Sequence, residues 1–525
     1  MSAVTQPRLP ISARTFVRNL AANWVMLVAE VAVAFLLTPF IVSRLGLAAY
    51  GVWGVLNSVI GYLGLVDLGI RGSIGRFVNY HLGRNEPREV NEVIVTSLAF
   101  LSAMALLAFL VSFVVAAFFG TLFPKTPAEL LDDASLVLPL MALGLWFAFS
   151  SAIFRTVVAA FDRFDLINLV GLVFLILRTA ATVAVLWAGW GLKGLVLVNV
   201  VNNALGTWAL LAVARRLFAT LQLRRALVSR TRFREIWKFG VVSFGSRTAS
   251  TLAVQTAPIV AMTFIGPKAV GVYGIAQMLI QNCQRVVEQL GVTIYPTIMK
   301  LGGTGERAAM RAAFEWYSRA VLLVGGLLYF GVIVFGAPFI DLWLGPELAA
   351  APPLAAILAC SELATVFTST ATLTLFSLGR LRVQFTIAVL HALSIVLLSV
   401  LLTGPLGFGL TGLAVGVLLP SIAFAGFAYP RAAARAIDLP LRPFYLRASA
   451  RLLLVAALAL AVFAGAARVV GVESWPRLLT AIAASTLVYL LLAAPVTLGL
   501  DGLRRAIDAL PLARSRRQPA AGDGR

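Results

Sequence analysis

The sequence contains few of the residues from which disulfide, metal and catalytic sites are built. Its 525 residues include two cysteines, Cys283 and Cys360, and two histidines, His81 and His391. Both cysteines lie inside apolar runs without Cys-x-x-Cys spacing, so neither a disulfide framework nor a thiolate metal site is indicated. Neither histidine has the neighbours of a metal site or of a Ser-His-Asp triad. We therefore expect no bound metal or other cofactor.

Charged residues are scarce as well. Asp, Glu, Lys and Arg make up 12% of the chain, hydrophobic residues make up 60%, and the mean hydropathy is +0.94. A soluble protein with this composition would lack the polar residues needed to cover its long apolar runs. The composition predicts an integral membrane protein that crosses the bilayer many times.

The apolar runs predict an all-α membrane protein with about fourteen transmembrane helices. A helix of about 20 apolar residues crosses a bilayer core of ~30 Å. The first run exceeds the apolar core of a signal peptide, so we expect it to be kept as the first span. The predicted spans are 19–43, 48–70, 92–120, 134–158, 164–188, 191–213, 237–264, 268–296, 312–337, 349–377, 381–403, 408–430, 446–468 and 476–499.

Two short sequences each occur twice in the chain. Residues 45–54 read LGLAAYGVWG and residues 265–274 read IGPKAVGVYG, with three glycines, one alanine and one valine coinciding at an offset of 220. Residues 191–195, GLKGL, return as GLTGL at 409–413, an offset of 218. Because the two offsets nearly agree, we predict a duplicated half of about 220 residues.

The duplication and the spans together predict how the chain is organised. The segment that joins the two lobes carries apolar residues among basic ones, which predicts an amphipathic helix on the membrane surface. A partner-binding role for this linker is the alternative. The predicted parts are a cytoplasmic N-terminal tail at 1–18, an N-lobe of six spans at 19–213, the basic interfacial linker at 214–238, a C-lobe of six spans at 237–430, two appended spans at 446–499, and a basic cytoplasmic tail at 500–525.

The distribution of the basic residues sets the topology. If the N-terminus is cytoplasmic, 34 of the 43 Lys and Arg residues fall in inside segments and six in outside segments. This bias follows the positive-inside rule and predicts that both termini are cytoplasmic. The net charge of +21 is thus a topology signal and does not indicate binding to nucleic acid.

Several charged residues interrupt the predicted spans. A charge at this depth is costly, so it indicates a functional site that faces a bundle interior or a wet cavity. At mid-depth lie Glu30, Arg178, Arg247 and Glu362, and in the cytoplasmic half of span eight lie Arg285 and Glu288. Asp67 and Arg71 lie at the cytoplasmic end of span two.

For two of these pairs a purely structural role stays open. Asp67 and Arg71 are four residues apart, and Arg285 and Glu288 are three apart, so each pair shares a helix face and can neutralise itself. Arg247 lies among small and hydroxyl-bearing residues, with no acid close by in sequence. Arg247, like Arg178, is therefore the better candidate for holding an anion.

Six stretches of the chain follow one family pattern in order and spacing. They are 38–46, 50–53, 61–62, 65–70, 163–169 and 266–273. Together with the fourteen spans, they resemble the bacterial polysaccharide (O-antigen type) flippases of the multidrug/oligosaccharidyl-lipid/polysaccharide exporter superfamily. The resemblance covers about residues 15–500.

This resemblance implies two six-helix lobes around a cavity lined by spans one, two, seven and eight, with the last two spans appended. It implies a substrate, a polyprenyl-pyrophosphate-linked oligosaccharide, moved by alternating access from the cytoplasmic to the outer leaflet of the bacterial inner membrane. The product would serve surface polysaccharide biosynthesis, whether O-antigen of lipopolysaccharide or exopolysaccharide. We expect membrane lipids, a glycan polymerase and chain-length machinery as partners.

The candidate site residues divide by charge. Arginine matches phosphate oxygens geometrically, so the expected pyrophosphate ligands are Arg247, Arg285, Arg71 and Arg178. The expected residues for Na⁺ or H⁺ coupling are Glu30, Asp67 and Glu288. Relatives often have an acid in span seven where this chain has Gln255, which argues against acid-based coupling through that helix.

Other functions remain open. A cation-coupled multidrug exporter of the same superfamily would favour an acidic, aromatic cavity and usually twelve spans. A peptidoglycan-precursor flippase would share fourteen spans and a cationic lumen, but its arginine-rich first span is not seen here. A membrane glycosyltransferase or polymerase would need an acid-bearing outer loop, and the largest outer segment, 121–133, is short. The sequence therefore favours a transporter over an enzyme.

Overall fold

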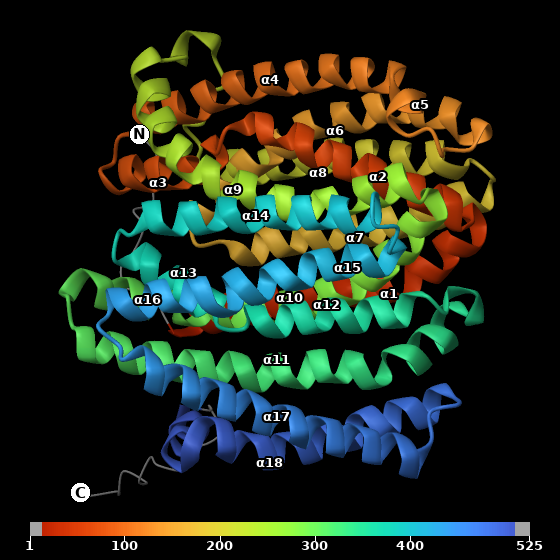
Figure 1. Ribbon diagram of the computed structural model, residues 1–525. Coiled ribbons are helices and arrows are strands. Elements are labelled where there is room, and N and C mark those ends of the chain that lie inside the picture. Colours follow the sequence, from red (N-terminus) through yellow and green to blue (C-terminus); the bar gives the residue numbers. More distant parts are fainter. Residues whose placement is uncertain (1–12, 510–525) are drawn as a thin grey trace, which may run out of the picture. The chain divides into compact units, whose positions relative to one another are not determined.

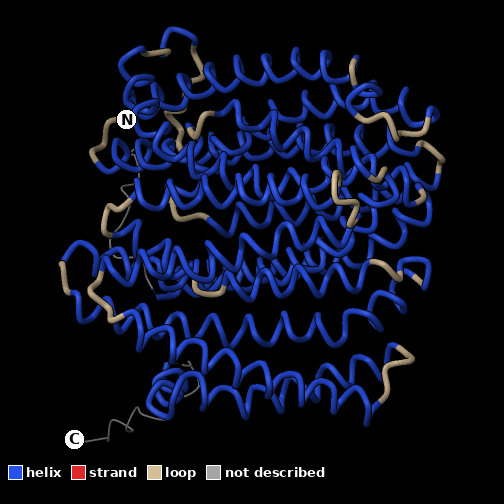
Figure 2. The backbone as a smooth tube through the Cα atoms, viewed as in Figure 1, coloured by secondary structure: helices blue, strands red, loops and turns tan. Residues whose placement is uncertain are grey.

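The computed structural model describes residues 13–509, without the side chains of 13–17, 20, 241–243, 246–247, 292–293 and 500–509. All regular structure in this part of the chain is helical, which confirms the predicted fold class (Figure 2). The chain divides into two compact units, unit 1 at residues 1–274 and unit 2 at residues 275–525.

Unit 1 is a bundle in which α6 packs along both α4 and α8, while α7 packs against α1 and α8 (Figure 1). Its helices are α1 (Ala13–Leu45), α2 (Leu47–Leu63), η1 (Gly64–Asp67), α3 (Ile70–Gly83), α4 (Pro87–Ala117), α5 (Phe119–Leu122), α6 (Ala128–Ala160), α7 (Phe164–Trp187), α8 (Gly191–Leu217), η2 (Arg225–Leu227) and α9 (Arg230–Phe264). The next helix, α10 (Pro267–Thr304), begins in unit 1 and ends in unit 2.

In unit 2, α11 packs against α12 and against the last two helices, α17 and α18. A second group is formed by α14 and α15, which pack closely side by side. The helices are α11 (Arg307–Leu344), η3 (Pro346–Leu348), α12 (Ala351–Thr365), α13 (Thr368–Ser377), α14 (Leu381–Thr403), α15 (Gly409–Pro420), the π-helical η4 (Ser421–Ala428), α16 (Tyr429–Ala436), α17 (Leu441–Val470) and α18 (Trp475–Ala509).

Each of the fourteen predicted spans lies on one helix or on a run of consecutive helices. Twelve of the described helices and runs are long and apolar enough to cross a membrane. The two that fall short, α9 and α10, correspond to predicted spans seven and eight. Both are longer than 30 residues, but polar and charged residues interrupt their apolar stretches. The protein is therefore a multi-pass membrane protein.

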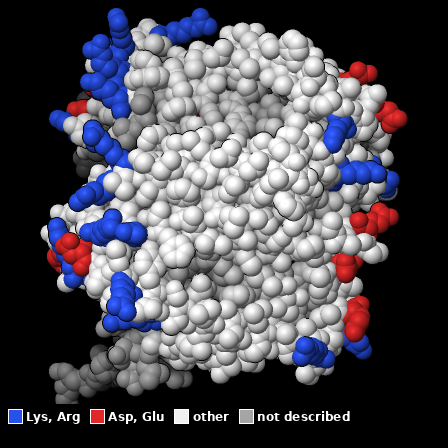
Figure 3. All heavy atoms as spheres, viewed as in Figure 1, with Lys and Arg blue, Asp and Glu red and all other residues white. Residues whose placement is uncertain are grey.

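The surface suits a hydrocarbon environment. Many large apolar side chains point outward, among them Leu36, which is 80% exposed, and Leu453, which is 69% exposed. On the face seen in Figure 3, charged residues lie at the helix ends in each unit, and the surface between the ends carries almost none. A surface of this kind is stable against lipid and would aggregate in water.

The linker differs from its prediction. Instead of one helix over 214–238, α8 continues to Leu217, a mostly irregular segment follows, and α9 begins at Arg230. The reason lies in the apolar residues, because Leu221, Phe233 and Trp237 pack on the core of unit 1. The Asn91 side chain also accepts from the Gln222 N–H and donates to the Thr220 carbonyl, which holds the non-helical segment in place.

The first repeated sequence forms the two helix junctions at 46 and 266. Gly46 separates α1 from α2 with φ = 76°, and Gly266 separates α9 from α10 with φ = 125°. Side chains disfavour positive φ, so glycine allows the chain to turn at both places. The second repeat behaves likewise, since Gly191 and Gly409 begin α8 and α15 with φ of 54° and 56°.

The two copies of the decapeptide also contact each other, and the contact is reciprocal. A Cβ on Gly51 would lie 1.8 Å from the carbonyl oxygen of Pro267, and a Cβ on Gly271 would lie 2.7 Å from the carbonyl oxygen of Leu47. Leu47 and Pro267 occupy the same position in the repeat, as do Gly51 and Gly271. The repeats therefore cross with local two-fold symmetry, and the crossing requires glycine on both sides.

This contact gives a first prediction. Gly51→Ala should lower the unfolding free energy by about 2 kcal/mol, because a methyl group would overlap backbone that cannot move aside locally. Thermal unfolding of the purified protein in detergent measures the loss. Gly72→Ala is the matched control, since its Cβ would meet nothing within 4 Å and the helix would gain slightly. Equal effects of the two substitutions would contradict the crossing.

Candidate functional site

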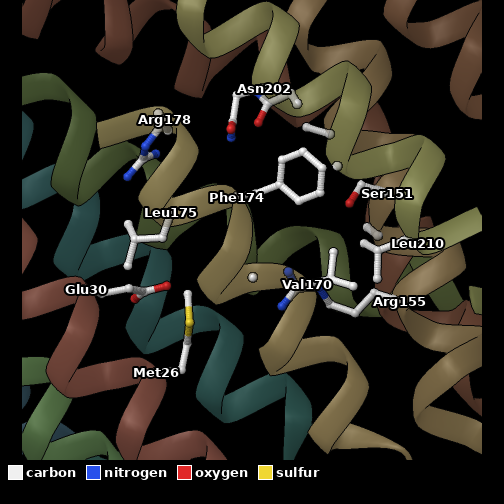
Figure 4. A pocket seen from close by; sticks show the side chains of 15 residues that line it. Met26, Glu30, Ser151, Arg155, Val170, Phe174, Leu175, Arg178, Asn202 and Leu210 are labelled. Atoms are coloured by element: carbon white, nitrogen blue, oxygen red, sulfur yellow. The ribbon is translucent and has the colours of Figure 1, made fainter. Parts of the chain in front are cut away.

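A cavity of about 360 Å³ lies within unit 1 (Figure 4). Four helices build it: α1, α6, α7 and α8. Small residues on these helices, including Ala148, Ala152, Gly171 and Gly206, leave the space open. The remaining lining residues are Met26, Glu30, Ser151, Arg155, Val170, Phe174, Leu175, Arg178, Asn202, Asn203 and Leu210.

Charged and amide side chains converge on this cavity. Glu30 from α1 and Arg178 from α7 lie on one side, and Arg155 and Ser151 from α6 lie on the other. Glu30 interacts electrostatically with Arg178. The cavity thus contains two arginines and one glutamate, an excess of one positive charge. Such a site can accept an anion while keeping its own acid paired.

The sequence predicted Glu30 and Arg178 but missed Arg155 and Asn202. Arg155 lies at the cytoplasmic end of predicted span four, where the positive-inside rule already accounts for a basic residue. Its position four residues after Ser151 places both side chains on one face of α6, and that spacing could have identified it. The adjacent Asn202 and Asn203 within an otherwise apolar span were a second available signal.

Asp67 and Arg71 form a separate ion pair in unit 1 and do not line the cavity. Asp67 is fully buried at the break between η1 and α3, where Leu68 and Gly69 both have positive φ. Its carboxylate accepts a hydrogen bond from the Gly69 N–H at 3.0 Å and is paired with the Arg71 Nε. The Arg71 guanidinium also stacks over the Phe149 ring at 4.9 Å. The structural role considered for this pair is therefore present in the fold.

In unit 2, Arg285 and Glu288 lie on α10 and interact electrostatically. Glu288 also accepts a hydrogen bond from the Gln284 side chain at 3.2 Å. Arg247 lies on α9, and its side chain is outside the described residues. All three acids proposed for ion coupling therefore lie within electrostatic reach of an arginine.

A second cavity, of about 380 Å³, lies in unit 2 between α10, α11, α17 and α18. Leu, Phe, Val, Ile and Gly residues supply almost all of its lining, so it suits an apolar chain better than a polar group. Within residues 13–509, no cluster of three or more His, Cys, Asp and Glu side chains is arranged to hold a metal ion.

Comparison with known proteins shows the family. A family model described as "Polysaccharide biosynthesis protein" matches residues 16–302, more than half of the chain. The chain belongs to this family. It is also 24% identical over 432 residues to the uncharacterized membrane protein EpsK of Bacillus subtilis (strain 168), covering 78% of this chain and 82% of that protein.

This chain is also similar in fold to solved structures of membrane transporters. A structure of the lipid II flippase MurJ in an inward closed conformation matches with a TM-score of 0.69 at 14% identity, covering 93% of this chain and 98% of its own. An inward-facing multidrug resistance MATE family transporter of the MOP superfamily matches with a TM-score of 0.65 at 13% identity, covering 79% and 95%. The fold of the chain is therefore similar to that of these transporters.

The cavity pair gives a second prediction. The Glu30→Gln/Arg178→Gln double variant should lose less unfolding free energy than the sum of the losses in Glu30→Gln and Arg178→Gln. The difference, which is the coupling free energy of the pair, should be about 1 kcal/mol. The value is modest because the cavity leaves Arg178 open to water. Denaturant unfolding of the four proteins measures the coupling. Ser151→Ala, on the opposite wall, serves as an uncharged control, and strictly additive effects would rule out the interaction.

The buried pair gives a third prediction. Asp67→Ala should cost about 3 kcal/mol of unfolding free energy, because it leaves the Arg71 charge and the Gly69 N–H without their acceptor. Asp67→Asn should cost less, since the amide oxygen can still accept from Gly69. Thermal unfolding distinguishes the two variants. If both behaved like wild type, the pair would not support the helix break.

Proposed function

We propose that this protein is a flippase for a glycan linked to polyprenyl pyrophosphate. It would move the substrate from the cytoplasmic to the outer leaflet, for surface polysaccharide biosynthesis. The observation that carries the proposal is the cavity of unit 1, which places Arg178 and Arg155 inside a membrane-embedded bundle of a polysaccharide biosynthesis family member.

The chemistry of the substrate fits this cavity. A pyrophosphate group cannot enter hydrocarbon without a partner, because transferring its charge from water is prohibitively costly. Arginine compensates for that cost with paired, charge-assisted hydrogen bonds to phosphate oxygens. Asn202 and Ser151 supply neutral polar groups of the kind that hydrogen-bond sugar hydroxyls. Arg178 is the proposed pyrophosphate ligand in this cavity. Arg247, Arg285 and Arg71, which do not line it, are proposed to contact the pyrophosphate at other stages of its passage.

The acid–arginine arrangement suggests how ion movement is coupled to transport. When pyrophosphate binds an arginine, it replaces the carboxylate that neutralised it. The released acid, Glu30, Asp67 or Glu288, would then take up H⁺ or Na⁺ to restore its own balance. Release of the substrate would reverse the exchange. In this scheme the arginine pairs with the substrate and with the acid in turn, and the acid holds the coupling ion while the substrate is bound.

The reciprocal glycine contact supports alternating access. It joins the α1–α2 and α9–α10 junctions, which the distribution of basic residues assigns to the outer side of the membrane. Opening to that side would separate the two copies of the repeat, and closure would bring them back together. The same assignment puts both termini in the cytoplasm. Membership of the polysaccharide biosynthesis family supports the bacterial inner membrane as the location. A glycan polymerase and chain-length machinery are the proposed partners downstream.

The specific observation that favours a second candidate is the match to MurJ, which extends over 93% of this chain and so includes the region of α17 and α18. A peptidoglycan precursor carries the same polyprenyl pyrophosphate group and would meet the same arginines. The substrates differ in the sugar and peptide portion. The apolar cavity beside α17 and α18 could hold the lipid chain of either one.

The fourth prediction concerns transfer activity in a reconstituted flipping assay. Purified protein in liposomes should move a fluorescent polyprenyl-pyrophosphate oligosaccharide from the inner to the outer leaflet. Arg178→Gln and Arg247→Ala should each lower the rate by tenfold or more, because a lost charged hydrogen bond changes an equilibrium by about that factor. An imposed Na⁺ or H⁺ gradient should change the wild-type rate.

Three further arms make the assay decisive. Arg477→Ala, an exposed residue paired with Glu473 near the start of α18, should leave the rate unchanged. Faster transfer of lipid II than of the oligosaccharide lipid would favour the peptidoglycan-precursor flippase. Export of a cationic dye with no lipid transfer would replace the proposal with a multidrug exporter. Normal rates in both Arg178→Gln and Arg247→Ala would remove these residues from the pyrophosphate site.

A further inference from the structure

A second basic site lies in unit 2, and none of the site residues considered above lines it. It is a small notch between α11 and α17, with a volume of about 20 Å³. Three arginines line it: Arg319 from α11, and Arg447 and Arg451 from α17. The other lining residues are Glu315, Ser318, Leu322, Phe367, Phe444 and Ala448.

The notch has an excess of positive charge. Its one acid, Glu315, accepts a hydrogen bond from the Arg319 Nη2 at 2.8 Å and also attracts the Arg451 charge. Arg319 and Arg447 both lie close enough to repel the Arg451 charge. Three arginines against one glutamate leave two positive charges, and like charges held this close favour binding of an anion.

Two polar groups at the notch lack partners. The Nε of Arg319 is buried, and so is the hydroxyl of Ser318, a residue that is only 4% exposed. Among the described residues neither group has a hydrogen-bond partner. Buried polar groups are rarely left in this state, and unpaired donors beside an excess of arginine indicate an absent acceptor.

Packing holds the notch in shape. Phe444 of α17 contacts the Phe314 ring of α11 and the Phe367 ring that precedes α13, with centroid separations of 5.6 and 6.3 Å. Phe444 itself is 9% exposed. These ring contacts fix α17 against α11, so the arginines are positioned before any ligand arrives.

The site also has a defined depth. Long apolar runs begin directly after Arg319 on α11 and directly after Arg451 on α17. Arginines at such a boundary lie at the level of lipid headgroups, where their side chains can reach phosphate. The notch admits one oxygen-sized group, which suits a single phosphate oxygen with the rest of the headgroup outside.

We propose that this notch binds the phosphate of an anionic membrane phospholipid, held by Arg319, Arg447, Arg451 and the Ser318 hydroxyl. A phosphate oxygen supplies the acceptor that the Arg319 Nε and Ser318 lack, and its charge offsets the arginine excess. The lipid would thereby brace α17 against α11. This site does not depend on the transported substrate.

Native mass spectrometry of the full-length protein in detergent tests the proposal. Wild type should retain phosphatidylglycerol in preference to phosphatidylcholine. The affinity of Arg447→Gln/Arg451→Gln for phosphatidylglycerol should be lower by at least about tenfold, as expected for lost charged hydrogen bonds. Added phosphatidylglycerol should raise the unfolding temperature of wild type and not of this variant.

The matched control is Arg435→Gln/Arg442→Gln, which removes the same charge from exposed positions in unit 2 that do not line the notch. Equal weakening in this control would show that the lipid responds only to general charge and would overturn the site. Displacement by inorganic phosphate as readily as by phosphatidylglycerol would assign the notch to a soluble anion instead. If the double variant fails to fold, Arg447→Gln, whose side chain is exposed, carries the same test.

Discussion

A charge placed inside a bilayer needs a partner or water, and this requirement organises the interior of the protein. Glu30 lies near Arg178, Asp67 pairs with Arg71, and Glu288 lies near Arg285. Each association lowers the free-energy cost of removing both charges from water. Under the proposed function, the substrate anion would take the place of the acid at such an arginine.

The same requirement explains why α9 and α10 differ from the other long helices. Both fall short of the apolarity of a membrane-crossing helix, and they carry two of the four residues proposed to bind the pyrophosphate, Arg247 and Arg285. A helix that faces only lipid cannot contain such residues, whereas one that lines a wet path can. The low hydropathy of these two helices thus results from the charged and polar residues that they place in the interior.

Much of the fold follows from local sequence. Apolar runs predicted where the long helices lie, and the decapeptide repeat contains both junction glycines, Gly46 and Gly266. What could not be predicted depends on tertiary contacts. The linker near Leu221 is not one helix because its apolar residues pack on the core, and Arg155 reaches the cavity only through the packing of α6. The expected roles of the site residues stay predictions, since charge and spacing do not reveal what a side chain binds.

The reciprocal contact between Gly51 and Gly271 has a consequence for ancestry. The start of the second copy lies six predicted spans after the start of the first, an even number, so both copies cross the membrane in the same direction. A shorter ancestor with one copy would have met an identical molecule through this same crossing, as a homodimer. Gene fusion would then have turned a subunit interface into an internal joint, after which Leu47 and Pro267 were free to diverge.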